Sequence, residues 1–284
     1  MTIKTIGIAG AGSMGSGIAN LAATSGFHVI INDIKEEYLQ KGIARMDKFM
    51  QKSIEKGKLT EAEKEEALNR ITTSVEIEAL QDADIVIEAI IEKMDAKKEI
   101  FSKLDQIMPE GVILATNTSS MSITEIASAT KRPERVAGMH FFNPAQIMKL
   151  VEVVRGYETS DETVEELKAL SKKLNKEPIE VKKDTPGFIV NRIMIPQFIE
   201  AIKLLEEGVA SAEDIDKAVT LGLNYPMGPF TLQDYAGVDI GYYTMEYFKE
   251  EFDDSRFAPP RLLKQLVRSG RLGRKTGAGF YDYE

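Results

Sequence analysis

The segment that most constrains the fold of this chain lies in residues 5–33. An apolar run at residues 6–9 leads at once into a glycine turn, Gly10-Ala11-Gly12-Ser13-Met14-Gly15. A helical pattern follows, and a second apolar run ends at Asp33, near the expected distance of about 20 residues from the turn. Strand, glycine turn, helix, strand and acid follow one another as in a dinucleotide-binding βαβ unit. We therefore expect a doubly wound, Rossmann-type α/β sheet.

All six residues of the turn are candidates for cofactor binding. Gly10 permits the tight turn, Gly12 lets the backbone approach a pyrophosphate, and Gly15 lets the helix pack against the strand. The N–H groups at the start of the helix favour the negative phosphates. Asp33 stands where a carboxylate accepts from a ribose 2′-hydroxyl. Its charge opposes a 2′-phosphate, which favours NAD over NADP, although Lys35 lies close by.

The composition argues against several other classes of function. The 284 residues carry a formal net charge of −9, so neither nucleic acid nor an anionic membrane is an expected partner. The absence of cysteine excludes disulfides, thiolate metal sites and a cysteine nucleophile, and we expect no metal. No apolar run is long enough to span a bilayer. We expect a soluble, cytoplasmic protein.

A helical hairpin interrupts the α/β pattern at about residues 36–70. Apolar residues recur at helical spacing in its first helix, and Thr60 with Glu63 forms a capping box that starts the second. One face of the first helix is basic, with Lys41, Arg45, Lys48, Lys52 and Lys56. This face is either an ordinary solvated surface or an anion site for a ligand with several phosphates.

Further buried strands are expected at residues 83–89, 111–116, 135–142 and 149–154. In doubly wound sheets the ligand lies at the carboxyl ends of the strands. The loops at those ends carry a set of polar side chains, namely Glu92, Lys97, Asn117, Ser119, His140 and Asn143.

His140 lies near the end of an apolar strand, where a buried core histidine is more usual than a catalyst. Glu152 changes that expectation. If the loop of residues 143–148 reverses the chain, the next strand pairs antiparallel, and Glu152 falls opposite His140 on the same face. The carboxylate would then orient the imidazole and raise its basicity, which makes a general base suited to neutral pH.

The pattern changes in kind at Asp184-Thr185-Pro186-Gly187. Helices follow without an intervening strand, so we expect a dinucleotide-binding domain at residues 1–184 and an all-helical domain at residues 185–284. The glycine-rich basic tail, residues 273–281, is either a surface segment or one that reaches the cofactor. The first helix expected in the second domain, at about residues 188–208, is strongly apolar. Its apolar residues either pack on a second copy of the chain, which we favour, or fill an internal core. They are Met194, Ile195, Phe198, Ile202 and Leu205.

Seven segments, in this order, resemble the L-3-hydroxyacyl-CoA dehydrogenases, and most closely the bacterial 3-hydroxybutyryl-CoA members. They are GAGSMGSGIA, IEAIIEKMDAKKEIF, NTSSMSITEIA, GMHFFNPAQIMKLVEVV, DTPGFIVNR, DIDKAVTLGLNYPMGPF and GRKTGAGFY. The resemblance covers essentially the whole chain, and its central HFFNP and DTPGFIVNR blocks are the most specific.

The resemblance implies an NAD-dependent interconversion of (S)-3-hydroxybutanoyl-CoA and acetoacetyl-CoA, in fatty acid and butyrate metabolism. It implies that His140 is the general base, that Glu152 orients it, and that Ser119 and Asn191 hold the oxygen atoms of the substrate. The second domain would close on the substrate and form a homodimer. The implied cofactor contacts beyond the glycine turn are Asp33, Glu92, Lys97, Ser119, Asn143 and Lys275. The implied acyl-CoA contacts are Ser119 and Asn143. Lys52 and Lys56 are also expected to contact the acyl-CoA, but only because of their charge and position.

Two other functions are compatible with parts of this pattern. A dehydrogenase of free 3-hydroxy acids would use a catalytic lysine, Lys97 or Lys275, and would have no use for CoA, but the HFFNP block argues against it. A non-enzymatic structural protein of the same fold would not need the set Ser119, His140, Glu152 and Asn191.

Overall fold

The computed structural model describes residues 3–283. The chain divides into two compact units, the first ending at Thr185 and the second beginning at Pro186. Each unit has a hydrophobic core of its own.

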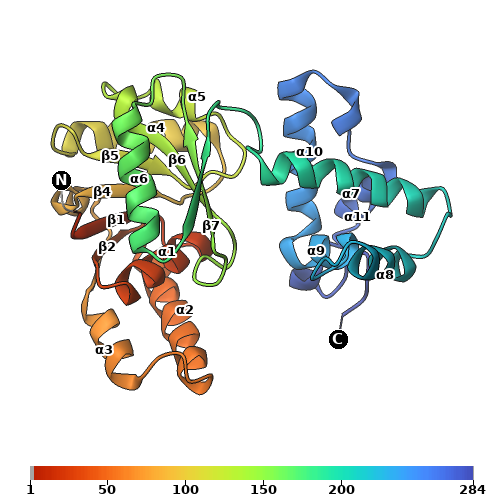
Figure 1. Ribbon diagram of the computed structural model, residues 1–284, viewed down its shortest axis with the longest axis horizontal. Helices are drawn as coiled ribbons and strands as arrows, with labels where there is room; N and C mark the ends of the chain where they lie inside the picture. The colour runs from red at the N-terminus through yellow and green to blue at the C-terminus, as the bar shows by residue number, and fades with distance from the viewer. Residues whose placement is uncertain (1–2, 284) are drawn as a thin grey trace. The chain divides into compact units, whose positions relative to one another are not determined.

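The first unit is built on an eight-stranded sheet with the order β3-β2-β1-β4-β5-β6-β7-β8 (Figure 1). All neighbouring strands are parallel except β6 and β7, which pair antiparallel. This sheet confirms the Rossmann-type fold expected from the glycine turn. The strands are β1 (Thr5–Ala9), β2 (His28–Asn32), β3 (Ile71–Ser74), β4 (Ile85–Glu88), β5 (Ile113–Thr116), β6 (Val136–Phe141), β7 (Leu150–Arg155) and β8 (Glu177–Val181).

Strand β3 is absent from the sequence-based expectation. It has only four residues, of which the two threonines are exposed, because it forms the edge of the sheet beside β2. A short polar edge strand carries no apolar run that would reveal it. His28 is the first residue of β2 and is exposed.

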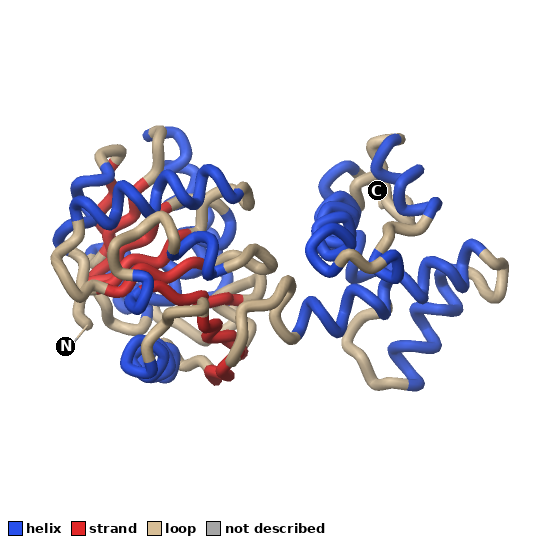
Figure 2. The backbone as a smooth tube through the Cα atoms, turned by 90° about the horizontal axis from the view of Figure 1, so that it is seen from above, coloured by secondary structure: helices blue, strands red, loops and turns tan. Residues whose placement is uncertain are grey.

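Helices cover both faces of the sheet, as Figure 2 shows with the strands between them. α1 (Ser13–Thr24) and α6 (Asp161–Lys173) pack on one face, and their apolar side chains join those of the strands in the main core. α4 (Met94–Ile107) and α5 (Ile123–Ala127) contact each other outside that core. Two short 3-10 turns complete the layers, η1 (Ile77–Asp82) and η2 (Pro133–Arg135).

The inserted hairpin consists of α2 (Glu36–Glu55) and α3 (Glu61–Asn69). Its predicted capping box is confirmed, because the Thr60 side chain accepts from the Glu63 amide and the Glu63 carboxylate accepts from the Thr60 amide at 2.8 Å. Gly42 brings α2 close to the glycine turn, since a Cβ there would lie 3.1 Å from the Ala11 carbonyl oxygen.

The second unit is helical, and no β-strand occurs among its described residues. Its elements are α7 (Val190–Glu206), α8 (Ala212–Gly222), α9 (Pro229–Ala236), α10 (Val238–Phe252), η3 (Ser255–Phe257), α11 (Arg261–Arg268) and η4 (Arg274–Thr276). Within residues 3–283, no helix is long and apolar enough to cross a membrane. The same residues contain no cluster of carboxylate or histidine side chains that could hold a metal ion.

The apolar residues of α7 fill the core of this unit. Ile195, Phe198 and Ile202 are buried there, and Met194 and Leu205 pack against it. The favoured expectation, contact with a second copy, is therefore wrong for the three buried residues. The helix is unusually apolar because α9, α10 and η3 all pack on it.

Candidate active site

The glycine turn leaves open space at one of its three glycines. A Cβ at Gly10, where φ is +107°, would lie 2.6 Å from the Ala89 carbonyl oxygen, and a Cβ at Gly15 would lie 1.8 Å from the Gly10 carbonyl oxygen. Only glycine fits these two positions. A Cβ at Gly12 would meet no atom within 4 Å, and Gly12 is the N-cap of α1. The first N–H groups of α1 therefore lie beside a space that suits an anion.

Asp33, directly after β2, lies against the same turn. One carboxylate oxygen accepts from the Ala11 amide at 2.7 Å, and the other accepts from the Ile34 amide at 2.7 Å. Each oxygen has capacity for a further hydrogen bond, so the carboxylate can still accept from a ribose hydroxyl. A 2′-phosphate at this position would meet a negative charge.

The predicted register that places Glu152 opposite His140 is confirmed. β6 and β7 pair antiparallel with these two residues facing each other, and His140 Nδ1 lies 2.7 Å from Glu152 Oε2. The carboxylate is fully buried and the histidine is 5% exposed. The Phe142 ring lies 4.5 Å from the imidazole between centroids. A buried carboxylate this close fixes the ring and favours a proton on Nδ1, so the pair is suited to proton transfer.

A buried ionic cluster lies at the carboxyl ends of β4 and β5. Lys97 Nζ is 2.7 Å from Glu88 Oε1 and 3.1 Å from Glu92 Oε2, although only 1% of the lysine side chain is exposed. Thr116 Oγ1 donates to the second Glu88 oxygen at 2.7 Å. Glu88 is not among the residues predicted from sequence. The sequence feature that could have revealed it is an acidic residue at the end of an apolar strand, because a buried carboxylate requires a cation nearby.

Glu92 connects this cluster to Ser119. Its carboxylate accepts from the Thr118 hydroxyl and, at 3.0 Å, from the Ser119 amide. Burial alone would raise the pKa of Glu92, but the charge of Lys97 and these hydrogen bonds outweigh burial and hold the pKa below its usual value. Glu92 is therefore ionised at neutral pH and fixes the loop that carries Ser119.

Two asparagines lie at the neighbouring strand ends. Asn117, after β5, accepts through Oδ1 from the Phe141 amide at 2.9 Å and so ties β5 to the residue that follows His140. Asn143 is exposed at the start of the loop of residues 143–148, and its bond to Pro144 is cis. The strand ends thus bring Ser119, His140 and Asn143 to one edge of the sheet.

The basic face of α2 divides into two parts. Arg45 turns toward the glycine turn, where it donates to the Ala11 carbonyl and the Ser16 hydroxyl. Lys41 forms an ion pair with Glu37 on its own helix. The remaining lysines, Lys48, Lys52 and Lys56, are exposed.

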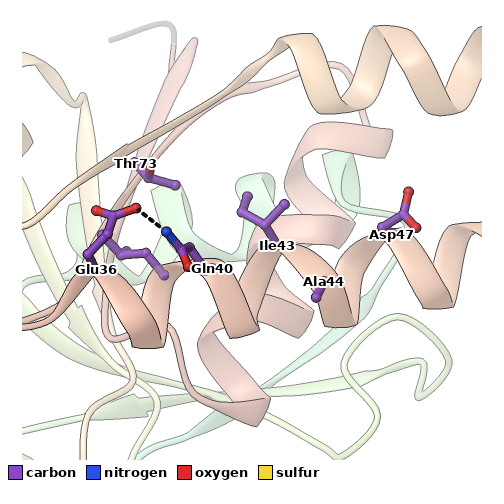
Figure 3. A pocket seen from close by; sticks show the side chains of 7 residues that line it. Glu36, Gln40, Ile43, Ala44, Asp47 and Thr73 are labelled. Carbon is purple, nitrogen blue, oxygen red and sulfur yellow. Dashed lines mark hydrogen bonds between the residues drawn. The ribbon is translucent and has the colours of Figure 1, made fainter.

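A cavity of about 350 Å³ lies beside the same helix (Figure 3). Leu39, Ile43 and Ala44 give it an apolar lining, and Glu36 and Asp47 place carboxylates at its two ends. These carboxylates disfavour a polyphosphate. None of the predicted site residues lines this cavity.

Asn191 and Lys275 belong to the second unit. Asn191 lies in the first turn of α7 and is half-buried. Lys275, in η4, has its Nζ at 2.6 and 2.7 Å from the two carboxylate oxygens of Asp239. The structure therefore gives Lys275 a local ion-pair partner in its own unit.

The glycine-rich tail also has a local explanation. A Cβ at Gly279 would lie 2.0 Å from Asp234 Oδ1, and a Cβ at Gly273 would lie 2.3 Å from the Asp234 carbonyl oxygen. The Asp234 carboxylate accepts from the amides of Phe280 and Tyr281, both at 2.9 Å. The glycines let the tail close around this buried acid.

Comparison with known proteins gives the family. Residues 5–185 match the 3-hydroxyacyl-CoA dehydrogenase NAD-binding domain, and residues 187–283 match the C-terminal domain of the same family. The probable 3-hydroxybutyryl-CoA dehydrogenase of Bacillus subtilis is 50% identical over 284 residues, covering 100% of this chain and 99% of that protein. The mitochondrial hydroxyacyl-coenzyme A dehydrogenase of Sus scrofa is 43% identical over 99% of this chain and 92% of its own length.

Solved structures agree. The crystal structure of (S)-3-hydroxybutyryl-CoA dehydrogenase from Ralstonia eutropha is 48% identical, covers 100% of both chains and gives a TM-score of 0.95. The resemblance drawn from the seven motifs is confirmed: this chain belongs to the 3-hydroxyacyl-CoA dehydrogenase family, and its first unit is the NAD-binding domain of that family.

Proposed function

We propose that this protein interconverts (S)-3-hydroxybutanoyl-CoA and acetoacetyl-CoA with NAD, and that His140 is its general acid and base. The observation that carries the proposal is the buried His140–Glu152 pair, 2.7 Å apart, in a sheet that belongs to an NAD-binding domain. The Bacillus subtilis and Ralstonia eutropha relatives are named for 3-hydroxybutyryl-CoA, which favours a short acyl chain.

The residues around the glycine turn fit the cofactor. The open space beside Gly12 and the N–H groups of α1 suit a pyrophosphate, and Asp33 suits the adenosine ribose. NAD, when bound, supplies the acceptor for the hydride that leaves C3 of the hydroxyacyl group. We assign Glu92 and Asn143 to the same cofactor, with Lys97 holding Glu92 in place, and Lys275 as a contact from the second unit.

His140 moves the proton of the reaction. Nε2 takes the proton of the substrate 3-hydroxyl in the oxidising direction and returns it in the reducing direction. Glu152 accepts from Nδ1–H, which fixes the tautomer, and its charge stabilises the imidazolium that forms. Ser119 and Asn191 are the residues we assign to holding the substrate oxygen, with Ser119 fixed by Glu92.

For CoA, we assign the exposed lysines near the end of α2. Lys52 and Lys56 lie one helical turn apart, and CoA carries three phosphates. Because exposed charges are screened by salt, the KM for the thioester should rise with ionic strength and rise less in the double variant Lys52→Ala/Lys56→Ala.

For the second unit, residues 185–284, we propose closure on the substrate and formation of a homodimer. The dimer is supported by exposed apolar side chains in this unit, among them Ile193, Leu221 and Leu223, which are 59, 75 and 62% exposed. Size-exclusion chromatography with light scattering tests the dimer, and a monomeric mass would contradict it.

The alternative chemistry with a catalytic lysine has little support. Lys97 is enclosed by Glu88 and Glu92 and is 1% exposed, so it is poorly placed to reach a substrate. Lys275 is engaged by Asp239.

One assay separates the candidate functions. Oxidation of NADH is followed by its absorbance, with acetoacetyl-CoA and in parallel with free acetoacetate. Turnover with the thioester alone supports the proposal. Turnover with the free acid alone supports a 3-hydroxy-acid dehydrogenase, and turnover with neither supports a non-enzymatic role. Repeating the assay with NADPH tests the preference for NAD over NADP that we expect from Asp33.

A further inference from the structure

Lys176 is a buried cation that the proposed chemistry does not use. It lies between α6 and β8 and is only 4% exposed. Its ammonium donates to the Ala145 carbonyl at 2.6 Å and to the Met148 carbonyl at 2.8 Å. Among the described residues, no charged side chain offsets its burial. Two backbone carbonyls are thus its only hydrogen-bond acceptors in the described part of the chain.

Both carbonyls belong to the loop of residues 143–148, which joins β6 to β7. This loop forms one tight turn, because the amides of Ile147 and Met148 both donate to the Pro144 carbonyl at 3.0 Å. His140 lies three residues before the loop, and Asn143 is its first residue. Any movement of the loop therefore acts on the strands that carry both members of the His140–Glu152 pair.

The loop also lies against α1. A Cβ at Gly17 would lie 3.4 Å from the Ala145 Cβ and 3.3 Å from the side-chain oxygen of Gln146. Ala145 itself is 2% exposed. The loop therefore contacts both the helix that follows the glycine turn and the Lys176 ammonium.

Burying the charged Lys176 ammonium at this place costs free energy. Burial disfavours the charged ammonium and lowers the pKa of Lys176, and no opposite charge compensates. An apolar side chain of the same length would avoid that cost but would leave two carbonyls without their donor. The ammonium is therefore suited to one task, which is to hold these two carbonyls in fixed positions.

We propose that Lys176 is a positioning residue for the catalytic loop. Its ammonium fixes residues 143–148 and, through them, the places of Asn143 and of the His140–Glu152 pair relative to bound substrate. The proposal rests on the function proposed above, because it assumes that these residues turn over an acyl-CoA.

The first test compares Lys176→Met with Lys173→Met, a change of an exposed lysine on the neighbouring end of α6. We expect Lys176→Met to lose about 10- to 100-fold in kcat at saturating NADH and acetoacetyl-CoA, as small misplacements of reacting groups do. Lys173→Met should match the wild type. A Lys176→Met enzyme with wild-type kcat would overturn the proposal.

A chemical rescue separates the charge from the volume of the side chain. The chain has no cysteine, so Lys176→Cys carries a single thiol. Alkylated in the unfolded state with bromoethylamine and refolded, it regains an ammonium at the same distance, whereas 1-iodopropane gives a neutral side chain with the same number of heavy atoms. Wild type taken through the same steps is the control. The ammonium form alone should regain kcat, and equal recovery by both forms would contradict the proposal.

Hydrogen exchange provides a readout that does not depend on turnover. In Lys176→Met, peptides spanning residues 143–148 should exchange faster, while those of α10 should not change. Unchanged exchange in the loop would refute the positioning role whatever the activity. A wild-type enzyme that fails to reduce acetoacetyl-CoA contradicts the proposed function itself, and this result is known before any variant is compared.

Discussion

Both units bury carboxylate side chains, but they satisfy them in different ways. In the first unit, the buried carboxylates Glu88 and Glu152 bond to ionisable side chains, while the buried Lys176 ammonium bonds to two main-chain carbonyls. His140 pairs with Glu152 at 2.7 Å, and Lys97 pairs with Glu88 at 2.7 Å. Glu88 is the last residue of β4 and His140 is the residue before the last of β6, at the edge of the sheet that faces a ligand in doubly wound folds.

In the second unit, the buried acids bond to the main chain and to hydroxyl groups. Asp216 accepts from the amides at the start of α9, with Phe230 at 2.8 Å and Thr231 at 2.9 Å. Asp234 accepts from the two tail amides and from the Tyr283 hydroxyl, all at 2.9 Å. Each acid therefore holds one segment of the second unit in place: Asp216 holds the start of α9, and Asp234 holds the tail.

The difference shows that burial alone does not identify a catalytic acid. Glu152 and Asp234 are equally inaccessible, at 0 and 1% exposure. Glu152 faces an imidazole, which can donate and accept a proton, whereas the donors to Asp234 are two main-chain amides and a tyrosine hydroxyl. We therefore expect substitution of Glu152 to act on turnover and substitution of the buried acids Asp216 and Asp234 to act on stability.

The largest effect is expected for His140→Gln. Loss of a positioned base removes about 10²- to 10⁴-fold of rate, so turnover of acetoacetyl-CoA with NADH should nearly vanish. NADH binding, measured by fluorescence titration, should persist because the glycine turn is unchanged. Unaltered turnover would remove His140 from the mechanism.

Glu152→Gln should have the next largest effect. An amide can still touch the ring, but it carries no charge to stabilise the imidazolium and can present its N–H₂ to Nδ1, which selects the wrong tautomer. We expect kcat to fall about 10²-fold, at the lower end of the contribution of a positioned base. A circular dichroism spectrum like that of the wild type would show that the loss does not come from unfolding.

Asp234→Asn should act on stability instead. The amide cannot accept from all three donors, and hydrogen bonds to a charged group contribute about 1.5–3 kcal/mol each. We expect urea unfolding to show a loss of about 2 kcal/mol, with kcat per folded molecule close to that of the wild type. A large loss of kcat at full folding would mean that the tail takes part in the reaction.

The smallest effect is expected for Tyr281→Phe. The Tyr281 hydroxyl donates to Asp216 at 3.0 Å, and its loss should cost about 1 kcal/mol at neutral pH. Burial and this hydrogen bond raise the pKa of Tyr281, so the folded state keeps the proton where the unfolded state loses it. The stabilisation is present below about pH 10, the ordinary pKa of tyrosine, and is lost as the pH rises further. Unfolding of the variant should therefore depend less steeply on alkaline pH, and identical slopes would contradict this origin.

Much of this arrangement follows from local sequence. The glycine turn predicts the sheet, and the short loop after His140 predicts the register with Glu152, because strand pairing has a period of two. The pairing of Lys97 with Glu88 and the burial of Lys176 are not predictable in this way. Lys176 belongs to a polar segment with other lysines nearby, and only the tertiary packing of residues 143–148 determines which of them is enclosed.

The side chains of α7 are a related case. Their apolar pattern indicates burial but does not identify the partner, and the structure places Ile195, Phe198 and Ile202 in the core of their own unit. A surface that binds a second copy of the chain must consist of exposed side chains. Helical periodicity alone does not distinguish such side chains from those of the core.

The most direct test of the central claim is to measure Glu152→Gln and Asp234→Asn side by side. Both replace a buried carboxylate by its amide, so the change in charge and volume is the same. The quantity to compare is kcat for NADH oxidation by acetoacetyl-CoA, expressed per folded molecule. We expect a loss of about 10²-fold for Glu152→Gln and almost none for Asp234→Asn. Equal losses in the two variants would contradict the assignment of proton transfer to the His140–Glu152 pair.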